Sequence, residues 1–238
     1  MTVKDGKWIM EELDKSLRIK SSKELSRLIR KIGFLPLFKG EIRGFSVEEH
    51  TNPGDWWAGV PEKDPWEWRT VLAGEDDIAY GKLFRNRAGF ISKEWFPVFA
   101  SYRRDGYDFD SRYEDGLASR KAKNIIDVLT EHKSLMSHDI KKLAGFGKEG
   151  EKGFEGAMTL LQMQTYITVR GFRHKLNKRG EEYGWSVSEY SLIEELFGED
   201  YVRSAYSVPA AECREQIIAR LRNLFPDTSY ETALKCIK

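Results

Sequence analysis

Cysteine and histidine, which most metal centres and many catalytic sites need, are scarce in this sequence. The chain has 238 residues, of which two are cysteines and four are histidines. Cys213 and Cys236 lie in helical patterns without metal-ligand spacing, so we expect no disulfide framework, no metal site and a reducing cytoplasm. The histidines are isolated from one another along the chain: His50, His132, His138 and His174.

Signature motifs of enzymes are absent as well. No H-E-x-x-H, G-x-S-x-G, Walker or G-x-G-x-x-G pattern occurs, so the sequence indicates neither a catalytic constellation nor a cofactor. The segment Glu48-Glu49-His50 has residues suited to acid–base chemistry, although nothing in the sequence shows a pocket around it.

The chain also lacks a strong net charge and long apolar runs. Charged residues make up 32% of it, yet the formal net charge is +1, so any affinity for nucleic acid must come from local patches. No apolar run approaches the roughly 18 residues that a membrane helix needs. The first residues, Met1 to Lys7, lack the apolar core of a signal peptide. We therefore expect a cytoplasmic protein that does not bind membranes, and we take a bacterial origin as a working assumption.

What the sequence does contain is a series of capped helices and short strands. Ser21 with Glu24 predicts a helix start, and Gly33 marks its end before Pro36. The apolar face of this helix is formed by Leu25, Leu28, Ile29 and Ile32. Further along the chain, the segments 78–84 and 88–91 are typical of a short hairpin.

The clearest pattern lies between Gly153 and Tyr190. It begins with an amphipathic helix whose apolar residues recur at the helical spacing: Phe154, Ala157, Met158 and Leu161. The period then changes to two, which predicts two strands around the basic turn 172–180. Two more helices precede this stretch, the second capped by Ser137. The order of helix, helix, helix, strand, basic turn and strand predicts a winged helix-turn-helix.

The expected fold is therefore α+β and mainly helical, with a winged helix-turn-helix module, short β-hairpins and flanking helices. We expect a tryptophan-rich helical and hairpin region at 1–116, which a degenerate winged helix would also fit. The polar loop 103–116 is the predicted junction. The winged helix follows at 117–190, and C-terminal helices at 191–238 pack on the core. No internal repeat is visible in the sequence.

A winged helix can place its third helix in the major groove and its wing on the DNA backbone. Residues 117–190 carry 13 Lys and Arg against 9 Asp and Glu, a local net charge of +4. The candidates for nucleic-acid contact are Lys148, Lys152, Thr159, Arg170, Arg173, Lys175, Lys178 and Arg179. We expect Lys152 and Thr159 to face outward. The alternative is a winged helix that contacts protein, with a solvated charged wing.

Two further groups of side chains carry open interpretations. Trp56, Trp57, Trp66 and Trp68 suit either a base-stacking platform or core packing. Gln162 and Gln164 are weak catalytic candidates, and at a helix-to-strand junction their amides also suit the pairing of loose backbone groups.

With these residues in view, the chain resembles the AlkZ-related proteins, distant relatives of the AlkZ (YcaQ) DNA glycosylases, which are built from winged helices. The resemblance covers roughly residues 22–205. Three passages carry it: Asp64-Pro65-Trp66-Glu67-Trp68 through Phe90, Trp95-Phe96-Pro97 through Asp110, and Leu161-Gln162-Met163-Gln164-Thr165-Tyr166.

The glycosylases resembled carry a Gln-apolar-Gln/Asp motif after an early helix, which positions water or stabilises charge at the sugar of the lesion. The matching place here reads Leu35-Pro36-Leu37-Phe38, so Pro36 and Phe38 replace both polar residues. The resemblance therefore implies a nucleic-acid-binding protein that is not catalytic. The alternatives are a glycosylase acting on alkylated or crosslinked bases, with the tryptophans as a base pocket, and a protein–protein interaction module.

Overall fold

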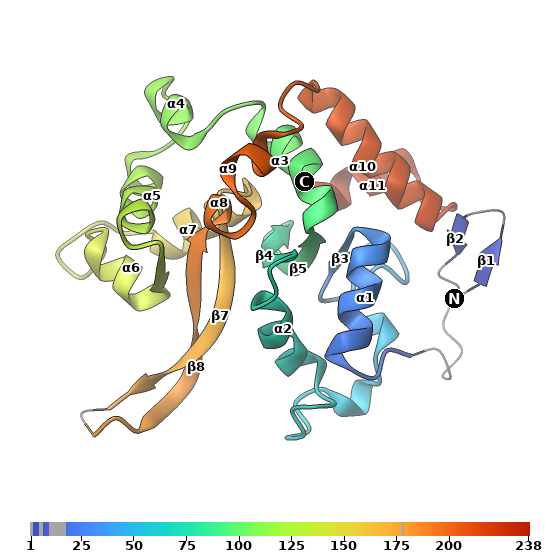
Figure 1. Ribbon diagram of the computed structural model, residues 1–238, viewed down its shortest axis with the longest axis horizontal. Helices are drawn as coiled ribbons and strands as arrows, with labels where there is room; N and C mark the ends of the chain where they lie inside the picture. Colours follow the sequence, from blue (N-terminus) through green and yellow to red (C-terminus); the bar gives the residue numbers. More distant parts are fainter. Residues whose placement is uncertain (1, 5–6, 10–17, 178) are drawn as a thin grey trace.

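The computed structural model describes residues 2–4, 7–9, 18–177 and 179–238 (Figure 1). It is an α+β structure, about 49% helical and 18% strand, which confirms the expected class. The N-terminal strands β1 (Thr2–Lys4) and β2 (Lys7–Ile9) form a small hairpin of their own.

The first half of the chain begins with α1 (Ser22–Ile32), as the capping pattern predicts. The hydroxyl of Ser21 accepts a hydrogen bond from the backbone N–H of Glu24 at 3.3 Å. Gly33 ends the helix at φ 102°, a conformation that glycine adopts without strain. The strand β3 (Phe34–Pro36) follows directly, and its three residues are buried.

The rest of this half is a short helix and a hairpin. Asp64 caps α2 (Pro65–Ala73), because its carboxylate accepts the backbone N–H of Trp66 at 2.8 Å. The strands β4 (Ile78–Phe84) and β5 (Arg87–Ser92) form the predicted hairpin. Among its described residues this half also has the short 3-10 helices η2 (Glu48–His50), η3 (Pro53–Asp55) and η4 (Lys93–Trp95).

The second half has the predicted order of three helices and a long hairpin, with one additional strand. Its elements are α5 (Arg120–His132), β6 (Ser134–Met136), α6 (Ser137–Leu143), α7 (Phe154–Met163), β7 (Ile167–Leu176) and β8 (Glu182–Leu192). In Figure 1 the hairpin of β7 and β8 extends away from the body of the molecule.

The segment 103–116, predicted as a loop, is partly helical. It contains the end of α3 (Phe96–Arg104) and the whole of α4 (Phe109–Glu114). The carboxylate of Asp108 caps α4 by accepting the N–H of Ser111 at 2.8 Å, and Phe109 is buried. A helix of six residues is too short to show the apolar periodicity on which the prediction relies.

The two halves share one six-stranded sheet, whose order is β3-β5-β4-β7-β8-β6. In each half the short first strand pairs with the last strand of the hairpin. The halves meet where β4 pairs with β7, through Tyr80 and Val169. The three strands of each half are therefore paired in the same order, a similarity that the sequence does not reveal.

The contacts between the halves are reciprocal. The helix α2 of the first half packs against β7 of the second, and α7 packs against β4. Two cationic side chains also form hydrogen bonds from one half to the other. Lys82 donates to the hydroxyl of Thr159 at 3.2 Å, and Arg170 donates to the carbonyl of Glu75 at 3.3 Å. Each half therefore covers part of a helix of the other.

The C-terminal part consists of α8 (Ile193–Phe197), α9 (Glu199–Arg203), α10 (Ala210–Leu224) and α11 (Tyr230–Ile237). In Figure 1, α10 and α11 lie beside α3, on its side away from α5 and α6. Their buried residues join the larger of two apolar clusters, which also contains α1 and β3. The smaller cluster lies among α5, α6 and α7.

A buried arginine ties these parts together. Arg104, at the end of α3, is 1% exposed. Its guanidinium donates to the carboxylate of Glu194 at 2.6 Å and to both the hydroxyl and the carbonyl of Thr165. It also lies 4.2 Å from the ring centre of Tyr166. The first half, the start of β7 and α8 thus share one hydrogen-bonded centre.

Candidate nucleic-acid interface

The most prominent surface feature is the hairpin of residues 167–192, which we call the basic hairpin. Its ladder has two register shifts, one between Val169 and Gly171 and one between Arg173 and Lys175. The side chain of Asn177 closes the turn by accepting the N–H groups of Arg179 at 2.8 Å and of Glu181 at 3.1 Å. Lys178, one of the predicted contacts, lies outside the described residues.

The predicted cations of the basic hairpin differ in how available they are. Lys175 and Arg179 are exposed and have no ion pair within the described part of the chain. The side chain of Arg173 is 71% exposed and pairs with Glu189 at 2.7 Å. Arg170 instead bonds to Asp76 at 3.2 Å. Arg170 therefore tethers the hairpin to the end of α2, whereas the other three face solvent.

A hollow of about 380 Å³ lies at the side of the basic hairpin. It is lined by Met136, His138, Arg173, His174, Lys175 and Tyr183, and none of these side chains carries a carboxylate. Arginine, lysine and histidine are donors suited to phosphate oxygens. A neighbouring hollow of about 310 Å³ shares Arg173 but also contains Glu189 and Glu195, so its charge is mixed.

The predicted contacts on and before α7 are only partly accessible. Lys148 and Lys152 are exposed, as expected. Thr159, predicted to face outward, is half-buried, and its hydroxyl accepts the ammonium of Lys82 at 3.2 Å. The physical reason is that α7 packs against β4 of the other half, a contact that no local pattern shows.

Gln162, one of the two weak catalytic candidates, is 2% exposed and hydrogen-bonded at both ends of its amide. Its carbonyl oxygen accepts the backbone N–H of Lys82 at 2.9 Å, and its NH₂ group donates to the carbonyl of Met158 at 3.0 Å. It thereby occupies the edge of β4 just beyond the single β4–β7 bridge. Gln164 is half-buried and lies at the C-cap of α7. The side chain of Gln162 has a structural role in this geometry.

The four tryptophans that suit a stacking platform are placed very differently. Trp68 is 2% exposed and its indole N–H donates to the carbonyl of Glu62 at 2.9 Å. Trp56 is 9% exposed and donates to the hydroxyl of Thr51 at 2.9 Å. Trp66 is half-buried, and Trp57 is 65% exposed. Core packing therefore accounts for Trp56 and Trp68, but not for Trp57.

An arginine that the sequence did not single out connects the tryptophans to the basic hairpin. The guanidinium of Arg69 lies 3.8 Å from the ring centre of Trp66 and 3.8 Å from that of Phe172 on β7. Burial lowers the pKa of Arg69, and the nearby Tyr80 and Glu67 oppose that shift. The spacing of Trp66 and Arg69 on α2 is a local signal, but their partner on β7 is distant in sequence.

The segment that matches the glycosylase motif has no polar side chain to offer. Pro36 lies in β3 opposite Gly89, and Leu37 is fully buried. The ring of Phe38 packs against Trp56, with ring centres 5.6 Å apart, and against Trp66 at 6.3 Å. This segment therefore packs against the tryptophans, and the side chains of Pro36, Leu37 and Phe38 carry no hydrogen-bonding group.

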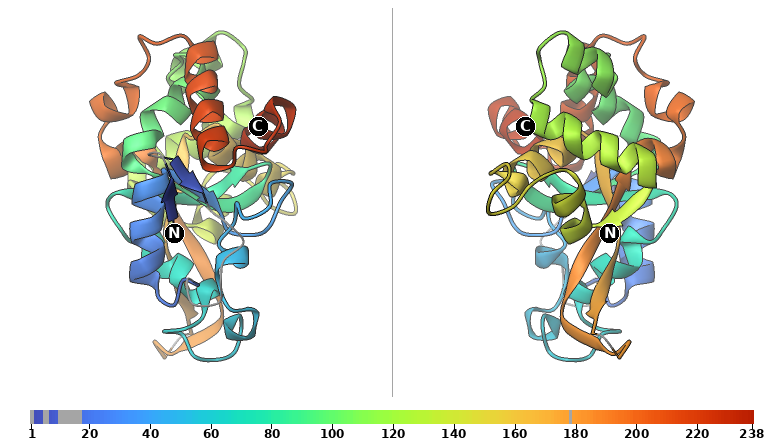
Figure 2. Two further views of the ribbon diagram at one scale, coloured as in Figure 1. Left: turned by 90° about the vertical axis from the view of Figure 1, so that its right-hand side faces the viewer. Right: turned by 90° about the vertical axis from the view of Figure 1, so that its left-hand side faces the viewer.

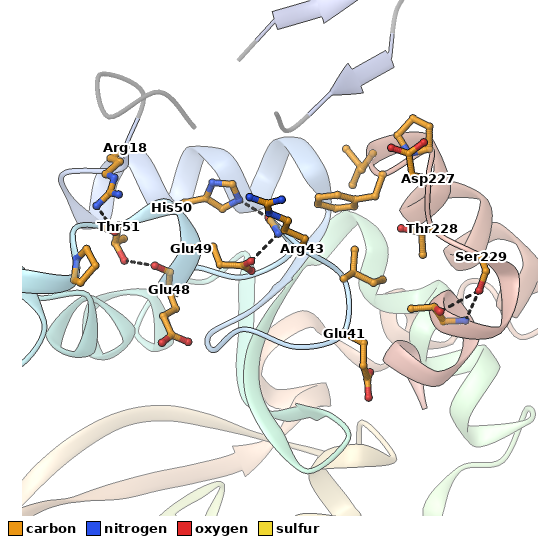
Figure 3. Close-up of a pocket in the computed structure, with 17 residues that line it drawn as sticks. Arg18, Glu41, Arg43, Glu48, Glu49, His50, Thr51, Asp227, Thr228 and Ser229 are labelled. Carbon is orange, nitrogen blue, oxygen red and sulfur yellow. Dashed lines mark hydrogen bonds between the residues drawn. The ribbon is translucent and has the colours of Figure 1, made fainter. Parts of the chain in front are cut away.

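The Glu48-Glu49-His50 segment does border a hollow, of about 800 Å³ (Figure 3). The opposite wall is formed by residues 224–229 near the C-terminus, which sequence spacing could not indicate. His50 is 2% exposed with its ring against the carbonyl of Gly44, and burial lowers its pKa. Glu49 accepts the N–H of Gly44 at 2.9 Å and the hydroxyl of Ser46 at 2.6 Å. His50 and Glu49 thus hold their own loop in place.

Metal sites and membrane-spanning helices are both absent from the described residues. No group of three or more His, Cys, Asp or Glu side chains among them is arranged to hold a metal ion. None of the helices in the described part of the chain has both the length and the apolar character needed to cross a membrane.

The fold and surface define an α+β protein of two similar halves that share a sheet, with a basic hairpin projecting from the second. The family model described as AlkZ related matches residues 19–238, and the chain belongs to that family. No curated protein and no solved structure matches the chain significantly.

Proposed function

We propose that this chain is a non-catalytic nucleic-acid-binding protein built from two winged helices, and that its basic hairpin grips the phosphate backbone of DNA. The assignment of winged helices is supported by the order of the elements in the second half. It is also supported by the strand order, in which the first strand pairs with the last in both halves.

The observation that carries the proposal is the hollow beside the basic hairpin. Arg173, Lys175, His138 and His174 are among the residues that line it, and no carboxylate lines it. Backbone phosphates are the anions that such a surface recognises without reading sequence. The exposed Lys148 and Lys152, which precede α7, supply further cations.

DNA is favoured over a protein partner by the family. Membership of the AlkZ-related family indicates a DNA-glycosylase-like lineage. Glycosylase chemistry itself is disfavoured by the side chains. Both ends of the Gln162 amide are already hydrogen-bonded, to Lys82 and Met158, and the side chains of Pro36 and Phe38 have no hydrogen-bond donor. Binding without base excision is the function that both observations support.

The test is the affinity for a 20-base-pair duplex, measured by fluorescence anisotropy at several salt concentrations. Replacing Arg173 and Lys175 by alanine should weaken binding to all sequences alike. Removing one cation that neutralises a phosphate should reduce the slope of log K against log salt by about 0.9, so the double variant should reduce it by about 1.8.

The matched control is the pair Lys23→Ala and Arg27→Ala, two exposed cations on α1, which lies away from the basic hairpin in Figure 1. It removes the same charge and should leave the slope unchanged. The proposal fails if the wild type shows no salt-sensitive binding to any duplex, or if both pairs reduce affinity equally.

A further inference from the structure

Trp57 is the most exposed large apolar side chain among those whose burial the structure describes, and its backbone is strained. The side chain is 65% exposed, and its φ of 56° lies in the left-handed region. A bulky residue is an outlier there, whereas glycine adopts this conformation readily. Strained backbone of this kind persists where the surrounding structure imposes it, and it is concentrated at functional sites.

The surrounding structure does impose it. The buried carboxylate of Asp64 accepts the backbone N–H of Trp57 at 2.8 Å and that of Trp66, also at 2.8 Å. The indole hydrogen bonds of Trp56 and Trp68 fix the same loop from either side. The ring of Trp57 thus lies exposed on the surface, against Trp56 with ring centres 5.4 Å apart, on a loop that these hydrogen bonds fix.

Trp57 is also connected to the basic hairpin through packed side chains. Its ring centre lies 6.0 Å from that of Trp66, whose ring also contacts the guanidinium of Arg69. Arg69 in turn stacks on Phe172 of β7, a strand of the basic hairpin. In Figures 1 and 2 the loop before α2 and the outer parts of β7 and β8 reach toward the same end of the molecule.

We propose that Trp57 is a stacking platform for one unpaired nucleobase, so that the protein prefers nucleic acid containing an unstacked base over intact duplex. This inference rests on the proposed function and adds its substrate class. An indole face binds any base by stacking, without reading its hydrogen-bonding edge. Bases of an intact duplex are stacked on both faces and cannot reach it, whereas an extruded base can.

The experiment compares three probes by anisotropy: an intact 20-base-pair duplex, the same duplex with one extra unpaired adenine, and a single strand. Stacking on one aromatic side chain corresponds to a preference of about 5- to 150-fold. The wild type should show such a preference for the bulged duplex. Trp57→Gly should abolish the preference while still binding intact duplex, and Trp57→Phe should retain most of it.

Trp57→Gly is expected to fold, because glycine suits a φ of 56°, and a thermal melt checks this independently of binding. Val71→Ala removes another exposed apolar side chain, 53% exposed on α2, and should leave the preference unchanged. A full preference in Trp57→Gly would overturn the inference while leaving the backbone grip intact. Absence of salt-sensitive binding to all three probes would overturn the proposed function, and this inference with it.

Discussion

Replacing Gln162 separates a structural glutamine from a catalytic one. The side chain is 2% exposed and joins α7 to β4 by accepting the N–H of Lys82 and donating to the carbonyl of Met158. Leucine is similar in size, larger by about one methylene, but has neither hydrogen-bonding group. Gln162→Leu therefore removes both hydrogen bonds while still filling the space, and Gln162→Ala also leaves a cavity.

The expected destabilisation follows from the two backbone groups left behind. A buried donor without a partner costs about 1–3 kcal/mol, and the N–H of Lys82 would be such a donor. The carbonyl of Met158 is less affected, because it is also an acceptor within α7. We expect Gln162→Leu to lower the free energy of unfolding by about 1–3 kcal/mol. Gln162→Ala should lower it by about 1 kcal/mol more, because of the cavity.

The assay is urea denaturation followed by circular dichroism, with Gln164→Ala as the matched control. Gln164 is half-buried, so its replacement should change the free energy of unfolding by no more than about 0.5 kcal/mol. Equal small decreases in Gln162→Leu and Gln164→Ala would refute the structural role of Gln162. So would base excision by the wild type that disappears in a fully stable Gln162 variant.

Two other buried groups give sharp stability predictions. Arg104→Met removes the partner of Glu194 and should lower the free energy of unfolding by about 3–5 kcal/mol. The reason is that a half-buried carboxylate and the carbonyl of Thr165 are left without their donor. A decrease below about 1 kcal/mol in urea denaturation would contradict this. Burial lowers the pKa of His50 in the folded state, so the unfolded chain takes up a proton first as the pH falls below about 6.5. The wild type should therefore lose more stability between about pH 7.5 and 5.5 than His50→Gln, and equal decreases would refute the neutral, buried state of His50.

The hollow beside His50 shows why part of the candidate site could not be predicted from the sequence. Glu48, Glu49 and His50 are adjacent in the chain, so their presence was evident. The hollow itself exists because residues 224–229 fold back against them. The same holds for Arg69, whose partner Phe172 is far away along the chain. Hydrogen bonds within a loop can be foreseen from spacing, whereas a wall contributed by a distant segment cannot.

The sequence by itself determined the local elements. Ser21 and Gly33 bound α1, and the change of period after α7 gives the basic hairpin. Each of these signals depends on hydrogen bonds and side-chain spacing within a few residues, so the elements could be predicted from the sequence. The cations of the hairpin could be located in the sequence for the same reason.

Only the tertiary structure decided how the halves meet. The pairing of β4 with β7 places α7 against β4. As a result, Thr159 is half-buried and the side chain of Gln162 is hydrogen-bonded to the backbone of Lys82. It also places Arg69 between α2 and the basic hairpin, and leaves the ring of Trp57 exposed. These outcomes depend on complementary surfaces far apart in the chain, and no local pattern encodes which surface will be covered.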